Sequence, residues 1–249
     1  MDKQQMTFNG VDFAAAMRTK GYKFSVEKIE GRGLLSNNVS SRPIPGADGE
    51  LFLDKSLPAR DISVSYNLIT DRAEDLRKAE RELSRLLQVD KPAQLRFEDQ
   101  QGYFEGIHGG VDTNYEYRGT QKGTIVFECK RPFLFHSYIT YKDYVFAVNE
   151  TRSFDILTNY KVLPILEFTI TGAQTSFAMT VNGRELKYTG AIPAGAKIAI
   201  DGEKKELRIN GALKVLEVDG WFPVMIGGAN TVKTSTSGTL SLKYQERYA

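Results

Sequence analysis

The sequence is poor in the residues that most catalytic and metal sites need. Its 249 residues contain one cysteine and two histidines. Cys129 cannot form an intrachain disulfide, and its place in an apolar, strand-like run predicts a buried, unreactive thiol. His108 and His136 are too few for a histidine-rich metal site, and no serine has the Gly-x-Ser-x-Gly context of a hydrolase nucleophile. We therefore expect no enzyme active site, no metal and no cofactor.

An excess of one charge and long apolar runs are also missing. Lys and Arg total 33 against 31 for Asp and Glu, and the two signs alternate along the chain. This balance argues against a dedicated nucleic-acid or anionic-membrane binder. No run approaches the roughly 18 apolar residues of a membrane span, and Met1–Gln5 does not begin a signal peptide. We expect a soluble protein that is made and used without the Sec pathway.

What is present favours a mainly β protein of two domains. Hydrophobic residues make up 41% of the chain and charged residues 26%, enough for ordinary cores. The length allows two domains of about 120 residues. Pro132 is expected to end strand pairing. We therefore place the domain boundary near residues 133–140. We predict two β-sandwich-like domains, 1–135 and 136–249. The last strand of the chain could pack against the N-terminal domain.

The first domain should contain one α-helix, at about 71–88. Its apolar residues recur at spacings of three and four: Leu76, Ala79, Leu83 and Leu86. Asp71, with Glu74 three residues later, is a candidate cap. The charged opposite face is either solvated or a subunit contact. Before the helix, Asp61–Ile69 alternates apolar and polar residues, as a half-buried strand does.

Residues 34–50, in the first predicted domain, are richer in glycine and proline than the strand and helix segments that follow them. Pro43, Pro45 and the glycines suit a long exposed loop or hairpin that is mobile in the isolated protein. Such a segment often becomes ordered only against a neighbouring subunit, although an ordinary surface loop is the alternative.

The second half contains short strand candidates separated by turn signals, as in an all-β sandwich. The candidates are 163–170, 177–181, 185–188, 197–201, 206–209 and 239–244. The turn signals are Asn182-Gly183, Asp201-Gly202, Asn210-Gly211 and Gly227-Gly228. Trp221 and Phe222 are the most exposed-looking aromatic pair. They are candidates for a ligand or partner contact, and core packing is the alternative for both.

Two stretches together resemble the distal tail proteins of long, non-contractile-tailed bacteriophages. The first has an R-x-I-x-V strand, one helix, a tyrosine-containing hairpin and a final F-x-C-x-x-P-F strand: Leu57–Val64, Leu95–Phe97, Tyr103–Gly106 and Gly123–Phe133. The second has N-G, I-D and F-P marks: Val181–Gly183, Ile200–Gly202 and Trp221–Asn230. In its last motif Gly227 replaces the usual proline.

The resemblance implies a phage- or prophage-encoded protein of the virion, located at the tail tip and synthesised in the cytoplasm of the bacterial host. Its N-terminal domains would form a homo-hexameric ring around the DNA channel, and its galectin-like or carbohydrate-module-like C-terminal domains would provide docking sites. The implied partners are the major tail tube protein, the tape measure, a tail-associated lysin or tip protein and a receptor-binding protein. The candidate ring contacts are Arg60, Asp61, Ile62, Val64, Pro43 and Pro45.

Two other functions remain open on the sequence. A carbohydrate-binding adhesin would bind cell-wall sugars through the second domain, and Trp221 would be its candidate contact. A cell-wall hydrolase attached to the tail is the enzymatic alternative.

Overall fold

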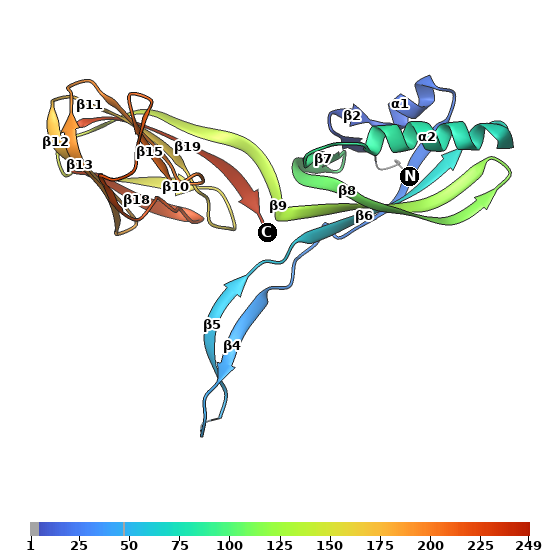
Figure 1. The fold of residues 1–249 in the computed structure, drawn as a ribbon, viewed down its shortest axis with the longest axis horizontal. Helices are drawn as coiled ribbons and strands as arrows, with labels where there is room; N and C mark the ends of the chain where they lie inside the picture. The colour runs from blue at the N-terminus through green and yellow to red at the C-terminus, as the bar shows by residue number, and fades with distance from the viewer. Residues whose placement is uncertain (1–4, 47) are drawn as a thin grey trace. The chain divides into compact units, whose positions relative to one another are not determined.

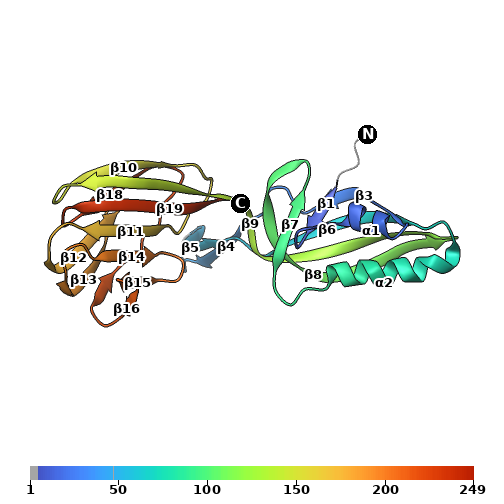
Figure 2. The same ribbon diagram turned by 90° about the horizontal axis from the view of Figure 1, so that it is seen from above.

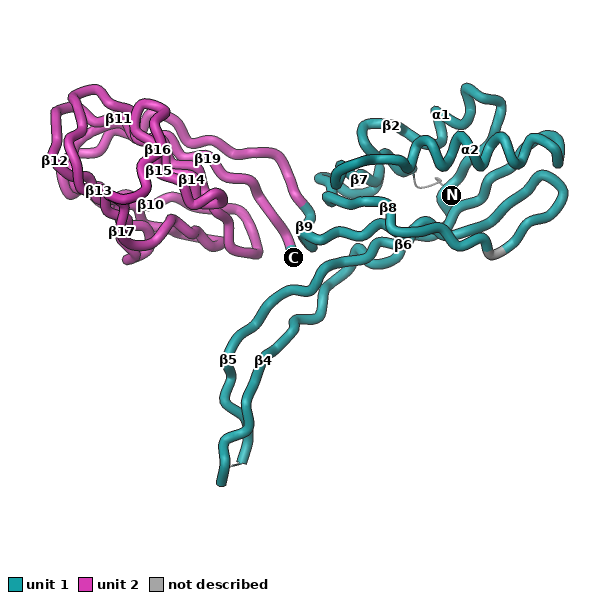
Figure 3. Tube along the Cα trace, viewed as in Figure 1, with its two compact units in different colours: residues 1–134, 249 teal, residues 135–248 magenta. Residues whose placement is uncertain are grey.

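The computed structural model describes residues 5–46 and 48–249. The chain divides into two compact units, which Figure 3 shows in different colours: unit 1 comprises residues 1–134 and 249, and unit 2 comprises residues 135–248. Of the segments singled out in the sequence, residues 1–4 and Ala47 lie outside the described residues.

Unit 1 is built on one sheet, with two helices on the same side of it (Figure 1). The spatial order of the strands is β3-β6-β9-β8-β7-β1-β2. Their bounds are β1 Met6–Phe8, β2 Val11–Asp12, β3 Lys23–Glu30, β6 Arg60–Ile69, β7 Ala93–Phe97, β8 Gln100–Tyr117 and β9 Thr120–Phe146. A separate two-stranded ribbon, β4 (Asn38–Pro43) with β5 (Glu50–Ser56), projects from the sheet between β3 and β6.

The core of unit 1 follows from the alternation along β6. Ile62, Val64, Tyr66 and Leu68 are all buried, and β6 pairs antiparallel with β9 so that Ile62 lies opposite Phe127. Phe127 in turn contacts Phe8, with ring centroids 4.9 Å apart. Cys129 is buried on the same strand, and burial raises the pKa of its thiol to about 12. The prediction that this thiol is buried is therefore confirmed, and a raised pKa disfavours the reactive thiolate.

The predicted helix exists, but its start and one core position differ. A 3₁₀ turn, Ala73–Asp75, leads into α2, Leu76–Leu87. Asp71 is not its cap: the helix begins after Asp75, whose side chain makes no capping bond and pairs instead with Lys78 at 2.7 Å. The buried stripe ends at Leu87, because Leu87 lies four residues after Leu83 and faces the sheet more directly than the half-buried Leu86.

A second helix, α1, was missed by the sequence analysis. It spans Phe13–Thr19 and buries Phe13 and Met17. The Asp12 carboxylate caps it by accepting the N–H of Ala15 at 2.9 Å. Seven residues are too few to show a helical period, and such a helix depends on packing for its stability.

Strand β9 does not end at Pro132, contrary to the prediction. It continues without a break to Phe146. Strand β6 pairs with β9 only as far as the Arg60–Cys129 pair. Beyond this pair β6 requires no backbone N–H from β9, so the missing N–H of Pro132 breaks no hydrogen bond with β6.

Unit 2 is a sandwich of two sheets, with strand orders β16-β15-β14-β11-β19-β9 and β10-β18-β12-β13-β17 (Figure 2). The strands are β10 Thr151–Ile156, β11 Ile165–Ile170, β12 Gln174–Val181, β13 Arg184–Ile192, β14 Lys197–Asp201, β15 Glu206–Ile209, β16 Ala212–Lys214, β17 Val218–Gly220, β18 Gly228–Thr234 and β19 Gly238–Tyr248. The last strand, β19, pairs with β11 within unit 2.

The turn chemistry of unit 2 agrees with its sequence. Asn182-Gly183 and Asn210-Gly211 both have two successive positive φ angles, as the tight turns of hairpins require. All six strand candidates of this half are found, whereas β10, β16, β17 and β18 were not foreseen. The mainly β class is thus confirmed. Within the described residues, no helix is long and apolar enough to cross a membrane.

The packing of α2 generates a stability prediction. Replacing Leu83 with alanine removes a buried side chain, so we expect unfolding to become easier by about 2–5 kcal/mol. The matched control is Arg81→Ala on the exposed face, expected to change stability by less than about 0.5 kcal/mol. Circular dichroism melts of both variants measure the difference. Equal melting temperatures would contradict the assigned core.

Candidate functional site

The ribbon β4–β5 and its connections, residues 34–59, are here named the arm. Every residue of both strands is exposed. The arm nevertheless carries large apolar side chains, and two of them, Leu34 and Phe52, are 96% and 60% exposed. The others are Val39, Ile44, Leu51 and Leu53. The apolar side chains of the arm therefore have no core within the protomer.

An isolated ribbon of this composition is at best marginally stable in water, since two strands bury too little apolar surface. The two strands pair with Ser41 opposite Phe52 and Arg42 opposite Leu51. Leu51 and Phe52 are adjacent and point to opposite faces, so the arm is apolar on both sides. An exposed apolar surface of this kind is typical of a site that contacts another protein, a membrane or a ligand.

The base of the arm is held by backbone that only glycine fits. Gly31 has φ +86°, and a Cβ at this position would lie 2.0 Å from the carbonyl oxygen of Asp61. Any other residue at position 31 would force the exit of the arm apart from the start of β6.

Arg60 holds the same base from the core side. Its Nη1 donates to the carbonyl oxygens of Gly31, at 3.1 Å, and Gly33, at 3.0 Å. The guanidinium also lies over the Phe104 ring, 5.2 Å from its centroid. Burial lowers the pKa of Arg60, and these contacts offset part of the cost of a buried cation. The direction in which the arm leaves is thereby defined.

A second arginine ties the base of the arm to the β7–β8 hairpin. Arg32 makes a two-pronged ion pair with Asp99, at 2.7 and 2.9 Å, and lies over Phe97. The hydrogen bond from Arg32 lowers the pKa of Asp99. Such fork-shaped pairs fix geometry better than a single contact does.

The structure separates the six candidate contact residues into two groups. Pro43, Pro45 and Asp61 are exposed. Arg60, Ile62 and Val64 are buried inside unit 1, at 3%, 0% and 0% exposure. Ile62 and Val64 lie in the hydrophobic core of unit 1, and the Arg60 guanidinium is bound within the protomer at the base of the arm. These three buried side chains are therefore not accessible to another subunit, whereas Pro43, Pro45 and Asp61 are.

Trp221 and Phe222 also differ from each other. Trp221 is 66% exposed, with Arg184 over its ring at 5.6 Å. Phe222 is partly buried and packs against the core of unit 2. Only Trp221 is therefore available to a ligand or partner.

The sequence analysis found the segment but missed its apolar surface. Leu34 and the run Leu51-Phe52-Leu53 were not singled out, although three consecutive large apolar residues beside a Gly/Pro-rich turn were a usable signal. Within the described residues, no cluster of three or more His, Cys, Asp or Glu side chains could hold a metal ion.

Comparisons with known proteins agree with this architecture. A family model described as the phage tail protein RIFT-related domain matches residues 19–129, and one described as the siphovirus-type tail component, C-terminal domain, matches residues 157–248. The two matches together span most of the chain. They fall on unit 1 and unit 2 respectively.

Individual relatives lead to the same family. The distal tail protein of Bacillus phage SPP1 is 26% identical over 196 residues, which cover 76% of each chain. The crystal structure of SPP1 Dit, described as a paradigm of the hub adsorption apparatus in phages that infect Gram-positive hosts, superposes with a TM-score of 0.81. It covers 99% of both chains at 18% identity, a likeness of fold. The chain belongs to the distal tail protein family of siphophages.

Proposed function

We propose that the protein forms a homo-hexameric ring at the tail hub, in which the arm of each protomer holds the next protomer. The observation that carries this proposal is that every residue of the two arm strands is exposed, with apolar side chains on both faces of the ribbon. A ring uses one contact repeated by rotation, so each protomer needs one element that reaches out and one surface that receives it. The arm supplies the first.

Membership of the family makes the protein a structural component of the phage tail and not an enzyme. We further propose that unit 1 forms the ring and continues the tube made by the major tail tube protein, in contact with the tape measure. Unit 2 would offer docking surfaces to a tail-associated lysin or tip protein and to a receptor-binding protein. Its exposed Trp221 is the first residue to test in such a contact. A net charge of +2 suits a channel that lets DNA pass without binding it.

The proposed ring has a defined mass and depends on the apolar contacts of the arm. Light scattering and negative-stain imaging should show rings of about 167 kDa, six times the 27.9 kDa protomer. Replacing Phe52 with aspartate should raise the concentration needed for half-assembly by about tenfold or more, because an apolar contact is lost at every interface.

The matched control is Ser56→Asp, which adds the same charge at another exposed position of β5. We expect it to assemble like the parent protein, and all three proteins to melt at the same temperature. A strictly monomeric parent protein at high concentration would overturn the ring. Full assembly of the Phe52 variant would overturn the role of the arm.

The base of the arm offers an independent test through two neighbouring glycines. Gly31→Ala should strain the exit of the arm by about 1–3 kcal/mol and weaken assembly, because its φ is positive and its Cβ would meet Asp61. Gly33→Ala is the control, since a Cβ there meets nothing within 4 Å. The concentration dependence of the oligomer measures both. Equal assembly of the two variants would contradict a fixed arm direction.

A further inference from the structure

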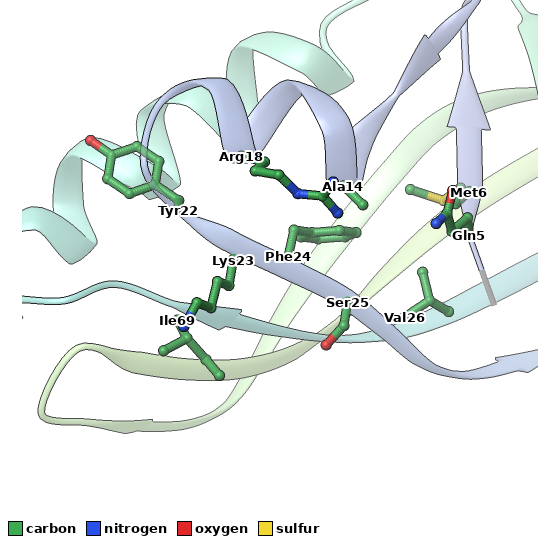
Figure 4. Close-up of a pocket in the computed structure, with 10 residues that line it drawn as sticks. All are labelled: Gln5, Met6, Ala14, Arg18, Tyr22, Lys23, Phe24, Ser25, Val26 and Ile69. Atoms are coloured by element: carbon green, nitrogen blue, oxygen red, sulfur yellow. The ribbon is translucent and has the colours of Figure 1, made fainter. Parts of the chain in front are cut away.

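Unit 1 contains a cavity of about 190 Å³ between α1 and the start of β3. Figure 4 shows Arg18 of α1 and Phe24 of β3 beside it, with Met6 at one end and Ile69 near the other. Its apolar lining is Met6, Phe24, Val26 and Ile69. A cavity of about 150 Å³ is known to hold benzene, so this one has room for a branched aliphatic side chain.

The charges around the cavity have one sign. Arg18 and Lys23 are exposed residues of its lining, and the lining includes no carboxylate. Arg18 stands in the last turn of α1, where a cation is favoured by the helix dipole. The cavity is therefore suited to an apolar group accompanied by negative charge.

The tip of the arm has the complementary chemistry. Ile44 is exposed there, 44% accessible, and two acidic residues, Asp48 and Glu50, follow it. The arm's arginine, Arg42, lies one residue pair further from the tip, because Pro43 and not Arg42 is opposite Glu50. Apolar and acidic groups thus coincide on the part of the arm that reaches furthest.

A protomer's own arm does not lie at this cavity in the structure. The cavity is lined by Lys23–Val26 and Ile69, which pair at one end of β3 and β6, whereas the arm leaves from the other end, after Glu30 and before Arg60. Seven residues of strand separate the two ends by about 23 Å. The arm also projects away from α1 (Figure 1). An arm that fills the cavity in this conformation therefore belongs to another copy of the chain.

We propose that this cavity is the seat of the arm tip of a neighbouring copy of the same chain. Ile44 would enter between Met6 and Phe24, while Asp48 and Glu50 face Arg18 and Lys23. The proposal rests on the proposed ring and names its receiving surface. A projecting element and a seat at opposite ends of one strand pair form a heterologous contact, which generates a ring when the repeated rotation closes.

Disulfide trapping tests the seat directly. A full-length chain with Ile44→Cys and Ala14→Cys should form, on mild oxidation, covalent multimers up to the hexamer on non-reducing gels. Ala14 lines the cavity. The matched control pairs Ile44→Cys with Ala15→Cys, because residue 15 is exposed and about 100° further round α1. The native Cys129 is buried and does not compete.

The outcomes separate the seat from the ring. Rings on imaging with cross-links at position 14 but not 15 support the proposal. Rings without cross-links, or with equal cross-links at both positions, overturn the seat and leave the ring standing. Absence of rings from the parent protein overturns the proposed function and the seat with it.

Charge reversal gives a second measurement that does not need cysteine. Arg18→Glu should raise the concentration for half-assembly by about fivefold. Adding Asp48→Lys to the same chain should restore most of that loss, since the two charges then attract again. Failure of the double variant to recover, with melting temperatures unchanged, would overturn the pairing of the tip with Arg18.

Discussion

The pairing of β6 with β3 on one side and β9 on the other is the constraint on which unit 1 depends. Ile62, Val64, Tyr66 and Leu68 lie in one row on the buried face of β6 and supply much of the core. Because β3 and β6 are antiparallel, their connection leaves the sheet at one end, and this connection is the arm. The same two strands border the cavity at their other end. The core therefore also sets the distance between the arm and the surface that we infer receives it.

A projecting ribbon assembles reproducibly only if its direction is held. Arg60 does this at the cost of burying a cation, and the carbonyls of Gly31 and Gly33 with the Phe104 ring offset part of that cost. Arg32 adds a solvent-accessible ion pair with Asp99. Such a pair orients the base of the arm but contributes little to the free energy of folding. The outer arm has no such support within the protomer, and its large apolar residues are exposed.

The motifs that carry the family resemblance are mostly structural. Arg60, Ile62, Val64 and Cys129 are all buried, so the pattern reports how unit 1 packs and not what it touches. This explains why the family and the mainly β fold could be inferred from the sequence, while the same residues were poor candidates for a subunit contact. Contacts are made by exposed side chains, whose identity the fold constrains far less.

The sequence by itself determined the strand alternation of β6, the position of α2, the Asn-Gly turns of unit 2 and the inert Cys129. Each of these depends on local periodicity or on residue chemistry. Only the tertiary structure decided the rest. A 3₁₀ turn precedes α2, so Asp71 does not cap this helix. Helix α1 is stabilised by the burial of Phe13 and Met17. Strand β9 continues beyond Pro132 because its pairing with β6 ends at Cys129. Exposure of the arm and the placing of the cavity at the far end of β3 depend on pairing between distant residues, which no local pattern records.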